Sequence, residues 1–170
     1  MLPGFLALES WFLILDSWFS YQYFCNMADQ NNIRLAVPFF MVRDMEASLD
    51  FYTSKLGFTI TNQWTPRGKI EWCWLQREAV SLMLQQPRNH DKLDQAGPKG
   101  NGVSIAFQCA DALALYHEFT AKGVDIKEPF VGNNMWVVCF ADPDGYKLDF
   151  ESPTDVEEET TYGDWEKQQG

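Results

Sequence analysis

The sequence predicts an α+β protein built from two tandem strand–helix–three-strand (βαβββ) units. Two apolar, strand-like runs, at 35–42 and 103–109, are each followed by an aspartate suited to cap a helix and then by a helical pattern. The two capping residues, Asp44 and Asp111, lie 67 positions apart, and the core positions of the helices that follow are related by the same offset. A supersecondary unit repeated in this way indicates an internal duplication.

The first unit covers about residues 33–86. After Asp44, apolar residues recur at steps of four, three and four, which predicts one helix with a single buried face. Gly57 stands where a left-handed residue would end that helix. Three strand-like segments with short polar turns follow, at 58–64, 70–75 and 79–85.

The second unit covers about residues 102–153 and repeats this order, with Gly123 ending its helix. Its three later strands are predicted at 125–131, 135–141 and 146–151. Between the units, residues 87–101 are polar and rich in glycine and proline, as in a linker or a loop over a site. Residues 154–170 form an acidic tail that we expect to be solvated.

Residues 1–32 form an apolar leader whose status the sequence leaves open. Glu9 and Asp16 interrupt it, so we expect no stable membrane insertion. No basic residue precedes Arg34, which argues against a signal peptide. An amphipathic helix that docks on a surface is one alternative, and a biological start at Met27 is another.

Composition narrows the classes of function. The formal net charge of −11 repels phosphate backbones and makes nucleic acid an unsuitable partner, whereas a cationic ligand would be attracted. Four cysteines without a C-x-x-C pair indicate free thiols in a reducing compartment, which favours the cytoplasm. The only two histidines, His90 and His117, nearly exclude a site that needs several imidazoles.

Three segments carry a resemblance to a known family. The first strand reads VPFFMVRD (37–44), the end of the first helix reads LDFYTSKLGF (49–58), and the last hairpin reads FADPDGYKLD (140–149). In this order and spacing they resemble the vicinal-oxygen-chelate superfamily of glyoxalases, extradiol dioxygenases, and fosfomycin- and bleomycin-resistance proteins. The resemblance covers about residues 33–153. It implies that the two modules form a cupped mixed sheet with helices on the outer face, usually in a homodimer.

The metal enzymes of that superfamily have histidine, histidine and carboxylate ligands at positions that here read Val37, Ser104 and Asp149. A serine and one carboxylate are too few donors to hold a divalent metal ion well. We therefore predict no metal, no cofactor and no catalytic residue. The chain most resembles the metal-free, bleomycin-resistance-like branch, although Trp136 replaces the arginine that such proteins often carry before the last hairpin.

The function predicted is a metal-independent protein that sequesters a small, cationic or aromatic molecule in an aromatic, acidic cup. The alternatives are a glyoxalase- or dioxygenase-like enzyme with an unusual metal site, and a purely structural dimerisation module. Side chains alternate along a strand, so residues in register with the ligand positions should line the cup, with Asp149 as its polar anchor. The predicted ligand-binding residues are Phe39, Trp72, Trp74, Gln108, Trp136, Asp149 and Glu151.

Overall fold

The computed structural model describes residues 32–33, 35–89 and 99–170. The chain divides into two units, Met1–Ala36 and Val37–Gly170, and the fold below is that of the second. The predictions for the leader and for His90 concern residues outside the described part. Within that part, no helix is long and apolar enough to cross a membrane.

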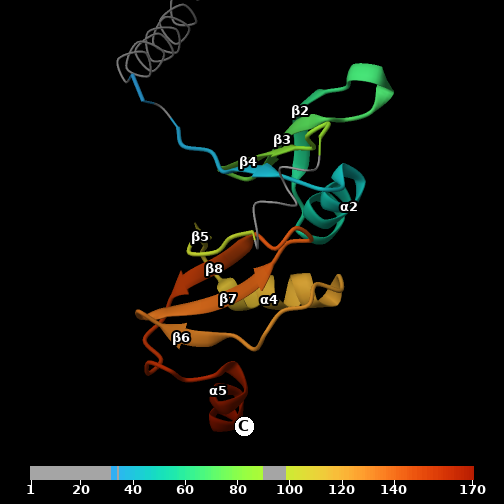
Figure 1. Ribbon diagram of the computed structural model, residues 1–170. Coiled ribbons are helices and arrows are strands. Elements are labelled where there is room, and N and C mark those ends of the chain that lie inside the picture. Colours follow the sequence, from blue (N-terminus) through green and yellow to red (C-terminus); the bar gives the residue numbers. More distant parts are fainter. Residues whose placement is uncertain (1–31, 34, 90–98) are drawn as a thin grey trace, which may run out of the picture. The chain divides into compact units, whose positions relative to one another are not determined.

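The first half forms a four-stranded mixed sheet, sheet A, with the strand order β1-β4-β3-β2 (Figure 1). β1 pairs in parallel with β4, because a helix carries the chain across the sheet between them, and the other pairs are antiparallel. The strands are β1 (Phe39–Met41), β2 (Thr59–Trp64), β3 (Trp72–Arg77) and β4 (Val80–Gln85). The crossing helix is α2 (Met45–Leu49), continued as a π-helix η1 (Asp50–Lys55), and the 3₁₀ turn η2 (Pro66–Gly68) joins β2 to β3.

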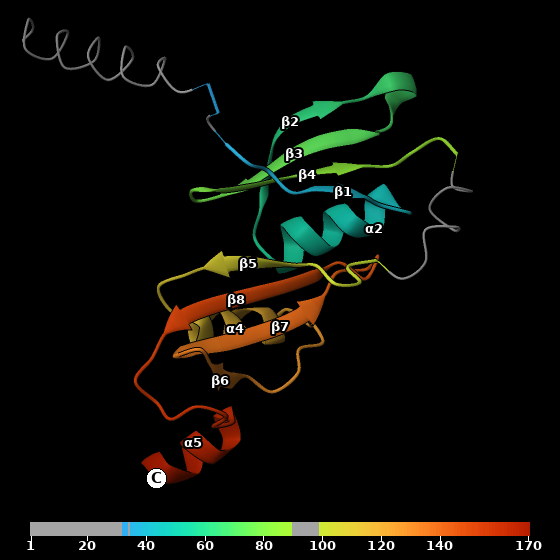
Figure 2. The same cartoon turned by 60° about the vertical axis from the view of Figure 1, so that its left-hand side comes forward.

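The second half repeats this topology in sheet B, with the order β5-β8-β7-β6 and a parallel β5–β8 pair. Its strands are β5 (Ser104–Gln108), β6 (Phe130–Gly132), β7 (Met135–Ala141) and β8 (Lys147–Pro153), and its helix is α4 (Ala112–Ala121). In both views a helix packs on one face of its sheet (Figures 1 and 2). The predicted tandem βαβββ duplication is confirmed.

Local sequence explains where the helices begin and end. The Asp44 side chain accepts hydrogen bonds from the backbone N–H groups of Glu46 and Ala47, and Asp111 accepts one from Ala114. These carboxylates satisfy N–H groups that have no partner within the helix. Gly57 follows the first helix with φ +73°, and Gly123 follows the second with φ +75°, conformations that glycine adopts without strain.

Two predictions of local structure need correction. The strand predicted at 125–131 is confined to β6, because Pro129 lacks the N–H that would extend the ladder before Phe130. The acidic segment after Pro153 is not wholly solvated. It ends in helix α5 (Tyr162–Gln169), whose aromatic residues pack against the second half of the domain. Trp165 of α5 meets Trp136 edge-on, with ring centroids 5.8 Å apart. The aromatic residues of the tail thus cover Trp136, which is buried.

The core lies between each sheet and its helix. On sheet A the covered positions are Phe40, Cys73, Leu75, Leu82 and Leu84, all buried. On sheet B they include Phe107, Val138, Phe140, Leu148 and Phe150. Fully burying one such aliphatic or aromatic side chain contributes about 1.5–3 kcal/mol. The opposite faces of the sheets, called the open faces below, are not covered by α2, η1 or α4.

Each half reaches into the other through the turn before its last strand. At the end of β3, next to the β3–β4 turn, the Arg77 guanidinium donates to the Leu56 carbonyl (2.6 Å) and to Glu118 of α4 (2.9 Å), and lies over the Phe119 ring. From the β7–β8 turn, Asp142 accepts a hydrogen bond from the hydroxyl of Tyr52 in η1 (2.9 Å). Polar contacts from each half therefore fasten it to the other.

Candidate functional site

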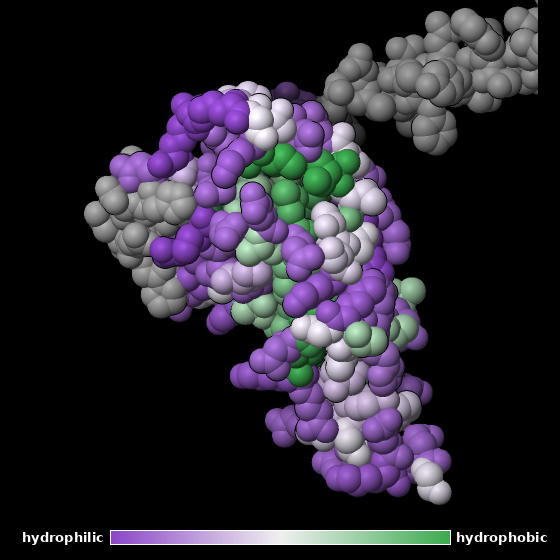
Figure 3. Space-filling view, turned by 90° about the vertical axis from the view of Figure 1, so that its right-hand side faces the viewer, coloured by the Kyte–Doolittle hydropathy of each residue, from purple (hydrophilic) through white to green (hydrophobic). Residues whose placement is uncertain are grey.

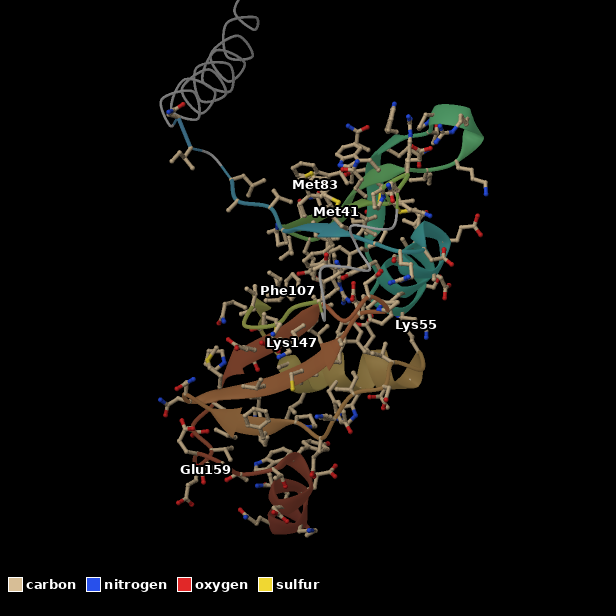
Figure 4. All side chains as sticks on the ribbon, in the orientation of Figure 1. Met41, Lys55, Met83, Phe107, Lys147 and Glu159 are labelled. Carbon is tan, nitrogen blue, oxygen red and sulfur yellow. The ribbon has the colours of Figure 1, made fainter. Side chains whose placement is uncertain are left out.

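The open face of sheet A carries aromatic and thioether side chains in two rows across its strands. The register aligns Phe39 with Met83, Met83 with Trp74, and Trp74 with Asn62. The next row joins Met41, Gln85, Trp72 and Trp64. Neighbours in such rows touch across the sheet, so each row forms a continuous strip. Met41 and Met83 lie next to each other in Figure 4.

This face is exposed although it is apolar. Phe39 is 43% and Trp64 50% accessible, and the two remaining tryptophans and both methionines are half-buried. Figure 3, which shows one side of the molecule, has hydrophobic side chains gathered in its upper half and mostly hydrophilic ones toward its lower end. Apolar residues that gather on one exposed face, rather than being scattered singly, are typical of a binding surface.

The open face of sheet B is polar at the corresponding positions. Its rows join Ser104 with Lys147, Ala106 with Asp149 and Cys139, and Gln108 with Glu151 and Val137. The Gln108 amide donates to the Glu151 carboxylate at 2.7 Å, so that acid already has a partner. Burial raises the pKa of the Cys139 thiol, and the nearby Asp149 adds to the effect. Cys139 is therefore a protonated thiol at neutral pH.

A cavity of about 490 Å³ lies where the edges of β1 and β5 approach each other. This volume is within the range of sites for drug-sized molecules. Its apolar wall includes Phe39 and Ile105, and its polar groups include Lys99 and Lys147. The full lining is Pro38, Phe39, Phe40, Lys99, Gly100, Asn101, Val103, Ile105, Tyr146 and Lys147.

Tyr146 fixes one wall of this cavity. Its ring stacks on Phe40 with centroids 4.3 Å apart, and its hydroxyl exchanges hydrogen bonds with the backbone N–H and carbonyl of Met41, both at 3.2 Å. Burial raises the pKa of this phenol, which stays neutral. Because Tyr146 precedes β8 and Met41 ends β1, these contacts hold the edges of the two sheets in place beside the cavity.

The predicted site residues fall into three groups. Phe39, Trp72 and Trp74 share the open face of sheet A, and Phe39 also lines the cavity. Gln108, Asp149 and Glu151 share the open face of sheet B and are absent from the cavity lining. The structure brings residues together within each face, and the cavity adjoins the aromatic one.

Trp136 belongs to neither face, and the expectation that it is available for stacking is corrected. It is 5% exposed and pairs across the strands with Val131 and Ser152, on the side of sheet B opposite Asp149. There it packs against Tyr162 and Trp165 of α5. The physical reason is strand alternation, since Val137, one residue on, takes the open side.

Sequence reasoning missed Met83, Trp64, Lys99 and Tyr146. The antiparallel register places Met83 beside Trp74 and Trp64 beside Trp72, a signal that alternation alone could have given once the strands were paired. Lys99 offered no such signal. It lies in a polar segment whose approach to β8 depends on the tertiary fold.

The metal site of the superfamily's enzymes does not fit these residues. Val37 has no donor atom, and Ser104 offers only a neutral hydroxyl opposite Lys147. His117 lies on α4, where its ring contacts the Tyr162 hydroxyl at 3.1 Å. Within the described residues, no group of three or more His, Cys, Asp or Glu side chains is placed to hold a metal ion.

Comparison with known proteins agrees with the resemblance drawn from the motifs. Residues 34–150 match the family described as the glyoxalase/bleomycin resistance protein/dioxygenase superfamily. The uncharacterized protein YurT of Bacillus subtilis is 29% identical over 121 residues, which are 66% of this chain and 94% of YurT.

Solved structures show the same fold. TnmS3, an antibiotic binding protein from a Streptomyces species, has a TM-score of 0.57 at 22% identity, covering 74% of this chain and all of that one (100%). A bleomycin resistance determinant encoded on the transposon Tn5 has a TM-score of 0.55 at 22% identity, covering 73% and 100%. With its two βαβββ halves and its matching motifs, this chain belongs to the glyoxalase/bleomycin resistance protein/dioxygenase superfamily.

Proposed function

We propose that this protein binds and sequesters a small aromatic molecule, without a metal ion, on the open face of sheet A and in the adjoining cavity. The observation that carries the proposal is the exposed double row of aromatic and methionine side chains, with Phe39 shared between the rows and the cavity. A planar ligand would stack on these rings and cover surface that is otherwise in contact with water.

The residue types suit a bulky and irregular ligand. Tryptophan offers a large, rigid stacking surface, whereas methionine has a flexible and polarizable side chain that adapts to shape. Met83 lies between Phe39 and Trp74 in its row, so an adaptable residue is flanked by two rigid ones. Burying a ring on such a surface gains roughly 25 cal/mol for each Å² of apolar area removed from water.

Two structural neighbours support the same class of function. One is named as an antibiotic binding protein and the other as a bleomycin resistance determinant. Their likeness to this chain is one of fold. A homodimer, as the resemblance implies, is part of the proposal and is checked by light scattering of the eluted protein.

The test is a fluorescence titration with N-phenyl-1-naphthylamine, a neutral aromatic probe. Trp74→Ala and Met83→Ala should each weaken binding, the first by about 1–3 kcal/mol through lost stacking and buried area. Ile60→Ala is the matched control, because Ile60 is an exposed apolar residue that pairs with buried Leu75 on the other face of the same sheet. Circular dichroism and the melting temperature establish that each variant is folded.

Two further readouts separate sequestration from catalysis. Mass spectrometry of the probe after prolonged incubation should recover it unchanged, and elemental analysis of untagged protein should find no stoichiometric transition metal. Equal affinity of the wild type, Trp74→Ala and Met83→Ala would exclude the open face of sheet A as the site. Conversion of the probe, abolished by a chelator, would favour the enzyme hypothesis instead.

A further inference from the structure

The cavity beside β1 and β5 has a charge opposite to that of the whole chain. The chain carries a formal net charge of −11, yet the cavity lining contains Lys99 and Lys147 and no acidic residue. We infer that the ligand is an aromatic anion, whose carboxylate, sulfonate or comparable group is held by these two lysines. This inference rests on the proposed function and adds the ligand's charge to it.

The backbone places the two lysines side by side. Gly100 has φ +63°, and a Cβ added there would lie 3.0 Å from both the Gly145 carbonyl oxygen and the Lys147 nitrogen. A Cβ added at Gly145 would in turn meet the Lys99 Cβ at 3.8 Å. Two glycines therefore allow the segment after Lys99 to approach the start of β8 closely, which brings both lysine stems to one end of the cavity.

Both ammonium groups are available to a ligand. Among the described residues, neither Lys99 nor Lys147 forms an ion pair or a hydrogen bond through its side chain. By contrast, Lys122 and Lys167 are each paired with a carboxylate at 2.7–2.8 Å. A charge beside an apolar wall is less screened than one in bulk water, so an entering anion is attracted more strongly there.

The rest of the lining specifies the ligand's body. Phe39, Val103 and Ile105 present apolar surface, and Phe39 and Val103 are 43% and 63% exposed without a ligand. A small inorganic anion would leave this surface in water, and a neutral aromatic molecule would leave both lysines unpaired. A molecule with an aromatic body and one anionic end satisfies both parts of the cavity.

This assignment departs from the cationic ligand that the overall acidity favours. Asp149 and Glu151, which would recognise a cation, are outside the cavity lining, and Glu151 is engaged by Gln108. Lys147 shares a strand face with Asp149 but, unlike Asp149, it lines the cavity. Local charge, rather than net charge, decides which ion a cavity accepts.

The experiment compares two probes with one aromatic skeleton. 8-Anilino-1-naphthalenesulfonate carries a sulfonate, and N-phenyl-1-naphthylamine lacks it. Each probe is titrated at pH 7.5 into three proteins. These are the wild type, the cavity double variant Lys99→Met/Lys147→Met, and the control double variant Lys55→Met/Lys69→Met. The last pair removes the same charge from half-buried Lys55 and exposed Lys69, neither of which lines the cavity.

The wild type should bind the sulfonate more tightly than the neutral probe. The cavity double variant should lose about tenfold or more in affinity for the sulfonate, as expected for charged hydrogen bonds, and keep its affinity for the neutral probe. The control double variant should retain its affinity for both probes. Lys147→Arg, which keeps the positive charge in the cavity, should bind the sulfonate nearly as well as the wild type does.

Equal binding of the two probes by wild type, or a cavity variant that binds the sulfonate as the control does, would overturn the anion inference and leave the aromatic proposal standing. Failure of wild type to bind either probe would overturn both.

Discussion

The two halves of this protein share one covered face and differ in the other. Tyr52 and Phe119 are fully buried at equivalent positions of the two helices, and each is held by a turn from the opposite half. On the open faces, however, Phe39 in β1 corresponds to Ala106 in β5, and Met41 corresponds to Gln108. The same topology thus presents an aromatic surface in one half and a charged surface in the other.

The difference shows which positions the fold constrains. Residues between sheet and helix must fill a closed space at high density, so their size and polarity are restricted. Residues on an open face have no partner within their half, so their chemistry is set by solvent or by a ligand. A binding function is therefore expected in the differences between the halves rather than in their common core.

The largest expected effect tests whether the covered faces are equivalent. Phe119→Ala and Tyr52→Ala each remove a fully buried ring and should lower the free energy of unfolding by about 3–5 kcal/mol. Urea unfolding followed by circular dichroism measures both. If one variant lost less than about 1 kcal/mol, the two helices would not be equivalent parts of one core.

A smaller effect concerns the contact through which the second half holds Tyr52. Burial raises the pKa of the Asp142 carboxyl to about 6, because desolvation outweighs the hydrogen bonds that it accepts. In the unfolded chain this pKa is about 4. The folded state therefore binds the proton more tightly, so the stability from this group is complete below about pH 4 and is lost as the pH rises through about 6.

Replacing Asp142 with Asn isolates that contribution. The amide keeps an acceptor for the backbone N–H groups of Asp144 and Tyr146, and its NH₂ group can donate to the Tyr52 oxygen. Between pH 4 and 6.5, wild type should lose about 2–3 kcal/mol relative to Asp142→Asn in urea unfolding. A constant difference across this range would show that Asp142 keeps its ordinary pKa in the fold.

Sequence reasoning was accurate where periodicity and backbone conformation decide the structure. The helix caps at Asp44 and Asp111 and the duplicated topology follow from local pattern alone. The alternation that directs the residues in register with Asp149 toward the cup implies that Phe40, Phe107 and Leu148 face the helices, and all three are buried. These properties depend on neighbours in the chain, which the sequence contains.

It was inaccurate where distant segments meet. Trp136 was expected on the open face, but its side is fixed by the pairing of Val137 with Glu151 and by α5, which covers it. The approach of Lys99 to Lys147 depends on two glycines 45 positions apart, Gly100 and Gly145, and no local pattern reveals that contact. The charge of the cavity therefore became visible only in the fold.

The smallest expected effect is at Asp149, on the charged open face. Asp149 lies in a row with Ala106 and Cys139 and is absent from the cavity lining, whereas Lys147 on the same strand face is part of that lining. Asp149→Asn keeps the shape and removes the charge. Its affinity for 8-anilino-1-naphthalenesulfonate should change by no more than about threefold, because a half-buried charge outside the site acts on the bound anion mainly through screening solvent. A cationic ligand anchored by this carboxylate would instead lose about 2–5 kcal/mol of binding free energy, the loss seen when a buried charge pair is truncated.

Titration of wild type and Asp149→Asn with this anion and with the cationic dye thioflavin T distinguishes the two cases. Tight binding of the cation that Asp149→Asn abolishes would place the ligand on the charged face and reverse the assignment of the two halves.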